Sequence, residues 1–216
     1  MASGRTSYIA TLHAVAGRLR ARAKPQGRLP ALIFVTDPVR TPDPEAVART
    51  LPRGAGVIFR AFGAADAIVV GRRLKAIARA RGLILLAGAD EALARVIGAH
   101  GVHLPERLAG RAGAIARRRP GWIVTVAAHG PRAIRVAARA GAHEVLVSPV
   151  FESASSSAGR PLGPTRFAAM ARTSPVPVIA LGGVTARNAK RLLGSGAAGI
   201  AAVDALLQPG SGRIRI

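Results

Sequence analysis

The sequence predicts an α/β fold, a (β/α)8 TIM barrel with an extra N-terminal helix. Eight short β-rich runs alternate with segments of helical period over about 185 residues, as in a small barrel. No Gly-x-Gly-x-x-Gly pattern follows the first run, which argues against a dinucleotide-binding open sheet. A doubly wound open sheet is the structural alternative.

The predicted elements follow one another in a regular order. Runs rich in Val, Ile and Leu predict strands at Leu32–Thr36, Gly56–Arg60, Leu83–Leu86, Gly101–Leu104, Trp122–Val126, Glu144–Ser148, Pro177–Leu181 and Gly199–Val203. Apolar residues at helical spacing predict helices at Ala65–Arg81, Asp90–Ile97, Pro131–Ala140, Arg166–Arg172 and Ala186–Leu193. Several strands are preceded by a Gly-Ala step, because glycine suits the left-handed turn that ends a helix.

Residues 1–30 predict a helix and a connector that precede the barrel. Between Tyr8 and Lys24, apolar residues that include Leu12, Val15 and Leu19 share one helical face. The segment is Arg-rich like a transit peptide, but it lacks the pattern of a secretory signal, and we expect a leading helix that covers one end of the domain. The barrel is expected over residues 31–208, with a C-terminal tail at 209–216.

Composition excludes several classes of protein. The chain has no cysteine, which excludes disulfides, thiolate nucleophiles and cysteine-bound metals. No apolar run reaches the roughly 18 residues of a membrane span, so we expect a cytoplasmic protein without a membrane partner. The net charge is +22, but only 3% of the residues are aromatic and available to stack on bases, so we do not expect a nucleic-acid partner.

Candidate site residues follow the predicted strands, because TIM barrels react at the carboxyl ends of their strands. An unpaired guanidinium at the end of an apolar strand is costly, so Arg60 is expected to bind an anion, with Asp37 as the alternative partner. Thr36 and His103 are expected to face the ligand, although alternation also allows His103 to point outward. No metal-ligand spacing such as His-Glu-x-x-His occurs, so we expect no bound metal.

Five segments together resemble the thiamine-phosphate synthase/TenI family. They are Leu32–Asp37 (LIFVTD), Gly98–Leu104 (GAHGVHL), Pro149–Ser153 (PVFES), Pro177–Val184 (PVIALGGV) and Gly196–Ala201 (GAAGIA). The family's order and spacing extend over residues 32–207. The resemblance implies a (β/α)8 barrel, commonly a homodimer, that acts on small thiazole or pyrimidine molecules in thiamine biosynthesis.

The synthase branch of this family joins a pyrimidine pyrophosphate to a thiazole phosphate, and Mg²⁺ holds the leaving pyrophosphate. The positions that supply its carboxylates correspond here to Gly88, Ala89 and Leu108, and the position of a family lysine is Phe62. Asp90 and Glu106 lie nearby but out of register. The resemblance therefore implies no cofactor, with Mg²⁺ only if the chain is an active synthase.

The second branch, typified by TenI, tautomerises a thiazole carboxylate phosphate. The resemblance places its proton-transferring histidine at His129, and an imidazole suits proton transfer near neutral pH. We therefore expect a thiazole phosphate-type ligand and a TenI-like tautomerase. An active synthase and a non-catalytic binding barrel are the alternatives, and His129 capping the next helix is the simplest structural role.

The resemblance also implies a phosphate site at Gly182 and Gly183 and at the turn after the eighth strand. It places Ser153 and Ser155 where family members have hydroxyl donors near the pyrophosphate, so both are expected to contact the ligand. Asp204 stands where the family usually has serine. Its carboxylate would repel a unit charge about 5 Å away by roughly 3 kcal/mol at an effective dielectric of 20. Either Asp204 turns away or the site does not prefer phosphate, and the sequence leaves both open.

Overall fold

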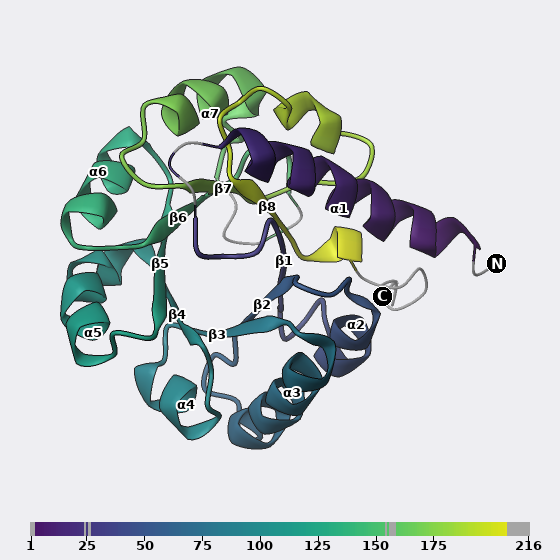
Figure 1. Cartoon of the computed structure of the whole chain (residues 1–216), viewed down its shortest axis with the longest axis vertical. Coiled ribbons are helices and arrows are strands. Elements are labelled where there is room, and N and C mark those ends of the chain that lie inside the picture. Colours follow the sequence, from purple (N-terminus) through teal and green to yellow (C-terminus); the bar gives the residue numbers. More distant parts are fainter. Residues whose placement is uncertain (1–2, 24, 26, 154, 156–158, 207–216) are drawn as a thin grey trace.

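The computed structural model, which describes residues 3–23, 25, 27–153, 155 and 159–206, is a closed barrel of eight parallel strands (Figure 1). The strands are β1 (Leu32–Val35), β2 (Gly56–Phe59), β3 (Ile84–Gly88), β4 (Gly101–Leu104), β5 (Ile123–Ala128), β6 (Glu144–Val147), β7 (Val178–Ala180) and β8 (Gly199–Ala202). Leu32 of β1 pairs with Ile200 of β8, which closes the sheet and leaves no edge. The predicted fold class is confirmed, and the predicted 209–216 tail lies outside the described residues.

The strands divide their side chains between two buried layers, because successive residues of a strand point to opposite faces. Ile33, Ile58 and Leu146 belong to a cluster that fills the interior of the barrel. Phe34 and Phe59, from the alternate positions, belong to a larger cluster between the strands and the surrounding helices. The barrel is therefore packed solid, and a ligand can bind only around its ends.

Helices and short 3-10 turns surround the barrel. They are α1 (Ser3–Arg22), α2 (Pro44–Thr50), α3 (Ala67–Arg81), α4 (Glu91–Val96), η1 (Glu106–Arg111), α5 (Ala112–Arg118), α6 (Pro131–Arg139), α7 (Gly163–Arg172), η2 (Ala189–Leu192) and η3 (Asp204–Leu206). The sequence did not predict α2, which is short and is started by the side chain of Asp43 and by Pro44 at its first position. It also did not predict η1 and α5.

The helix predicted at Ala186–Leu193 is wrong, because this segment forms only the short 3-10 turn η2. The side-chain oxygen of Asn188 accepts a hydrogen bond from the backbone N–H of Thr185, which holds the preceding residues in a local turn. Gly194, with a φ of 79°, ends the element soon afterwards.

The N-terminal helix α1 packs through Leu12, Val15 and Leu19 where the barrel closes, against β1, β8, η2 and η3. The connector after it adds Ala23 and Leu29 to the interior cluster, at the amino end of the strands. The other end of the barrel carries the candidate site. Among the described helices, none is long and apolar enough to span a membrane.

Candidate active site

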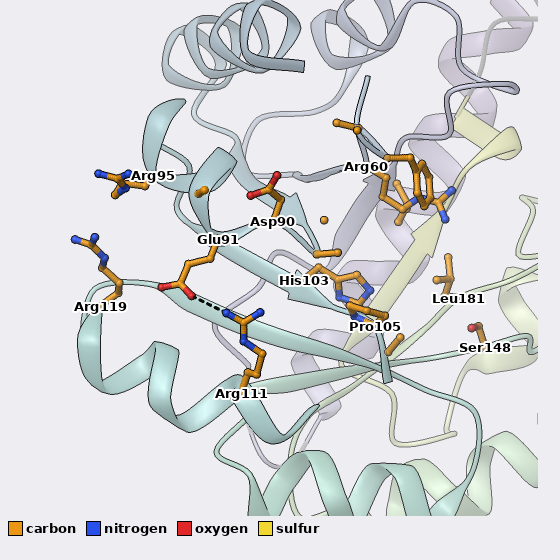
Figure 2. Close-up of a pocket in the computed structure, with 18 of the residues that line it drawn as sticks. Arg60, Asp90, Glu91, Arg95, His103, Pro105, Arg111, Arg119, Ser148 and Leu181 are labelled. Atoms are coloured by element: carbon orange, nitrogen blue, oxygen red, sulfur yellow. Dashed lines mark ion pairs between the residues drawn. The ribbon is translucent and has the colours of Figure 1, made fainter. Parts of the chain in front are cut away.

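A cavity of about 790 Å³ opens beside the carboxyl ends of the strands (Figure 2). Arg60, His103 and His129, which the sequence predicted from three different strands, all line it. Figure 2 shows Arg60, His103, Ser148 and Leu181 along one side of the cavity. On the other side lie Glu91, Arg95, Arg111 and Arg119, which extend the cavity between α4 and α5.

Arg60 is held in place by the two residues that follow β1. Its Nε donates a hydrogen bond of 2.6 Å to the carbonyl oxygen of Thr36, and its Nη2 donates one of 2.9 Å to Oδ2 of Asp37. The buried Thr36 hydroxyl oxygen also accepts a 2.9 Å bond from the Arg60 backbone N–H, so Thr36 positions Arg60 from behind. Asp37, the alternative partner in the sequence analysis, therefore binds Arg60. Nη1 of Arg60 makes no hydrogen bond to any described residue.

Burial shifts the pKa values of Arg60 and Asp37 in opposite directions, because it disfavours the charged form of each group. It lowers the pKa of Arg60, and the charge of Asp37 opposes that change. Burial also raises the pKa of Asp37, but its hydrogen bonds from Arg40 and the nearby charges of Arg40 and Arg60 outweigh burial, and the pKa is lowered overall. Both groups are therefore charged near neutral pH, and Arg60 presents a fixed cation to the cavity.

His103 points inward and lies in the wall of the cavity. Its side chain is buried, and its Nδ1 lies 2.9 Å from Oγ1 of Thr125 on the next strand. Burial, with a smaller contribution from the charge of Arg60, lowers the pKa of His103 to about 4. His103 is therefore neutral at pH 7 and contributes a polar but uncharged group.

His129 follows β5 and is exposed to the cavity. Its Nδ1 lies 2.7 Å from the backbone carbonyl oxygen of Ser148, and its backbone N–H donates to Oε2 of Glu106. Because a carbonyl oxygen only accepts hydrogen bonds, this contact assigns the proton of the neutral ring to Nδ1 and leaves Nε2 with a free lone pair. His129 does not cap the next helix, since the N-cap residue of α6 is Gly130 and no side chain caps that helix.

A second, smaller cavity of about 140 Å³ lies beside the first, at the ends of β7 and β8. Gly182 and Gly183 line it with φ values of 89° and 65°, a backbone conformation that glycine adopts without strain. The backbone N–H groups of Gly182, Gly183 and Val184 make no hydrogen bonds to described residues. Three adjacent free donors around a small cavity suit an anion, and we call this cavity, with the turn at Asp204, the cradle.

Asp204, Ser153 and Ser155 differ in how they lie relative to the cradle. Oδ2 of Asp204 accepts a 2.9 Å bond from Nη1 of Arg40, an arginine in the loop after β1 that the sequence analysis did not select. Ser153 lines the cradle, and its Oγ accepts a bond from the backbone N–H of Ser155, which lines neither cavity. Asp204 therefore turns toward Arg40.

Phe62 lines the larger cavity, and the sequence analysis did not select it as a ligand contact. It is 72% exposed at the rim and has a φ of 48°, which a side-chain-bearing residue rarely adopts. The guanidinium carbon of Arg60 lies 5.3 Å from the centre of its ring. Exposed aromatic surface and a strained backbone at a cavity are features of binding sites, but neither is visible in the sequence.

Comparison with known proteins settles the family. The family model described as thiamine monophosphate synthase matches residues 32–206, which include all eight strands. This chain belongs to that family. A thiamine-phosphate synthase from Chlorobium luteolum is 30% identical to it, and the alignment covers 82% of this chain and 85% of that protein. A thiamine-phosphate synthase from Alcanivorax borkumensis is also 30% identical, and the alignment covers 84% of this chain and 87% of that protein.

Two further comparisons bear on how far the family resemblance extends. A relative from Geobacter sulfurreducens is 36% identical, but the alignment covers 53% of this chain and only about half, 54%, of that protein. The solved structure of a thiamine phosphate pyrophosphorylase from Pyrococcus furiosus has a TM-score of 0.70 and 21% identity, covering 80% of this chain and 84% of that one, and it shows the shared fold. The synthase names agree with the alternative function of the sequence analysis, and no comparison resolves the TenI branch.

The carboxylates of this family member do not fit the Mg²⁺ site that the resemblance implies for a synthase. Oδ1 of Asp90 accepts a bond from the backbone N–H of Leu93 and caps α4. Glu91 forms ion pairs with Arg111 and Arg118. Among the described residues, no three His, Asp or Glu side chains are grouped as ligands for a metal. These carboxylates therefore serve the protein's own backbone and arginines.

Proposed function

We propose that this barrel binds a thiazole phosphate, with the phosphate in the cradle and the ring in the larger cavity. The observation that carries the proposal is the place of Leu181, which lines both cavities, so the two lie side by side. A phosphate on a short arm can reach the free N–H groups of Gly182 and Gly183 while its ring faces His129. Membership of the thiamine monophosphate synthase family supports this ligand class.

The reaction that the geometry supports best is a proton transfer on the thiazole. Nε2 of His129 carries the free lone pair, because Nδ1 donates to the carbonyl of Ser148. Nε2 takes a proton from a ring carbon, and His129 returns a proton to the other end of the conjugated system, so the product is a tautomer of the same composition. Because His129 is exposed, the proton that it holds can exchange with solvent before it is returned. The free Nη1 of Arg60 suits a carboxylate on the ring, since a guanidinium binds carboxylates strongly.

The second candidate is the coupling reaction that forms thiamine phosphate, and the names of the relatives favour it over the proton transfer. In that reaction the thiazole nitrogen forms a bond to the pyrimidine methylene carbon, and pyrophosphate leaves with the bonding electrons. The cations of the larger cavity that could hold that leaving group are Arg60, Arg95, Arg111 and Arg119. Among the described residues, the carboxylates near these arginines do not form a metal site.

Two assays on the same protein separate these reactions. Proton transfer is followed by NMR, as exchange of the ring proton of a thiazole carboxylate phosphate in deuterated water. Coupling is followed as thiamine phosphate formed from the thiazole phosphate and the pyrimidine pyrophosphate, with and without Mg²⁺. We expect exchange and no coupling. Coupling without exchange would replace the first reaction with the second, and binding without either reaction would make the barrel a non-catalytic binder.

A further inference from the structure

The charges around the cradle are unusual for a phosphate site. Among the described residues that line it, Arg40 is the one basic side chain, while Glu152 and Asp204 are acidic. A dianionic phosphate that approached the free N–H groups of Gly183 would therefore meet more negative than positive side chains. Either the cradle rejects phosphate or the single arginine is made available when phosphate binds.

Arg40 is fixed at one side of its guanidinium and exchangeable at the other. Its Nη2 lies 3.2 Å from Oδ2 of Asp37, whose Oδ1 also accepts from the Arg40 backbone N–H. Asp37 is in turn held by Arg60, so this side of Arg40 belongs to a partly buried network. Among the described residues, Asp204 alone accepts a hydrogen bond from Nη1, at 2.9 Å.

Asp204 is the more exposed member of this pair. Its side chain is 52% exposed, whereas those of Arg40 and Asp37 are 19% and 18% exposed. A carboxylate at the surface loses little solvation when it rotates into water, and an exposed ion pair contributes little to stability. Phosphate can therefore replace Asp204 as the partner of Nη1 without disturbing the contact between Arg40 and Asp37.

We propose that Arg40 is a phosphate-binding residue of the cradle and that Asp204 is the counter-ion which phosphate displaces. The carboxylate of Asp204 occupies Nη1 of Arg40 while the cradle is empty. On binding, the carboxylate turns to solvent, and the phosphate takes the Nη1 bond together with the backbone N–H groups of Gly182 to Val184. The proposal rests on the phosphate position given under Proposed function, but not on the reaction.

The test is a titration with inorganic phosphate by isothermal calorimetry at low ionic strength. Arg40→Gln is expected to weaken binding by about tenfold or more, because a charge-assisted bond is lost. Asp204→Asn is expected to tighten binding severalfold, because its competing carboxylate is removed. The double variant Arg40→Gln/Asp204→Asn is expected to bind as weakly as Arg40→Gln alone. Arg135→Gln, an exposed substitution on α6, is the matched control for loss of one positive charge.

Three results would overturn the proposal. The first is that Arg40→Gln folds normally, as judged by circular dichroism, and binds phosphate as tightly as Arg135→Gln does. The second is that Asp204→Asn tightens phosphate binding equally in the wild-type protein and in Arg40→Gln, since Asp204 would then act by repulsion alone. The third is no phosphate binding by the wild-type protein or by Asp204→Asn. If Arg40→Gln does not fold, Arg40→Lys is the replacement, with an intermediate affinity expected. Phosphate binding as predicted without turnover in either assay would leave this proposal standing and reject the proposed reaction.

Discussion

Nδ1 of His129 and the carbonyl oxygen of Ser148 lie 2.7 Å apart, at the ends of β5 and β6. The acceptor is part of the backbone, so the orientation of the imidazole does not depend on another titratable side chain. The contact fixes which ring nitrogen of the neutral imidazole keeps its lone pair. It is the structural reason for expecting His129 to act as a base.

The first prediction compares two substitutions at His129. His129→Asn keeps an N–H donor near the position of Nδ1 but removes Nε2, so proton exchange should fall by about 10²- to 10⁴-fold. Affinity for the thiazole phosphate should change little, because the phosphate binds elsewhere. The measurements are the NMR exchange rate and calorimetric binding. Undiminished exchange in a folded His129→Asn protein would exclude His129 as the base.

The second prediction concerns pH and the buried His103. Its pKa is about 4 when folded against about 6.5 when unfolded, so the unfolded chain binds more protons between these values. Its contribution to the free energy of unfolding is therefore fully present above pH 6.5 and is lost as the pH falls toward 4. The expected loss is about 3 kcal/mol.

Urea unfolding of the wild-type protein and of His103→Gln at pH 4.5 and 7 isolates this contribution. Burial raises the pKa of Glu144 and lowers those of His100 and His143, and these groups titrate in both proteins. The difference between the two proteins therefore belongs to His103. The variant should lose less stability on acidification, and equal losses in both proteins would contradict the burial of a neutral His103.

Most of the fold was predictable from the sequence, because burial on both faces leaves a continuous apolar run for each strand. The local contacts that set the short elements were less visible, such as the turn at Thr185 and Asn188. In the site, the register of strand ends brought Arg60, His103 and His129 together as expected. The pair of Arg40 and Asp204 joins residues 164 positions apart through loops, and no periodicity marks such a contact.

The third prediction concerns the strained rim residue Phe62. Its positive φ is a conformation that glycine adopts freely, so Phe62→Gly should relieve strain and raise the free energy of unfolding by up to about 1 kcal/mol. Phe62→Ala keeps the unfavourable backbone and should not stabilise the protein. Both substitutions remove the exposed ring and should weaken binding of a thiazole phosphate more than binding of inorganic phosphate. If both ligands lose the same affinity, the ring of Phe62 does not contact the heterocycle.

The fourth prediction tests the backbone of the cradle. Gly183 has a φ of 65°, and a Cβ there would collide with the backbone carbonyl of Glu152. Gly183→Ala should therefore cost about 1 to 3 kcal/mol of stability and displace the N–H groups of the cradle. Gly110→Ala is the matched control, since a Cβ at Gly110 would meet no atom within 4 Å and its φ is not positive.

Calorimetric titration with phosphate and urea unfolding distinguish the two effects of Gly183→Ala. Phosphate affinity should fall at temperatures where the variant is still folded, while Gly110→Ala binds like the wild-type protein. If Gly183→Ala loses stability but keeps its phosphate affinity, phosphate does not bind through these N–H groups. The anion site would then lie at the arginines of the larger cavity, where Arg60 offers its free Nη1.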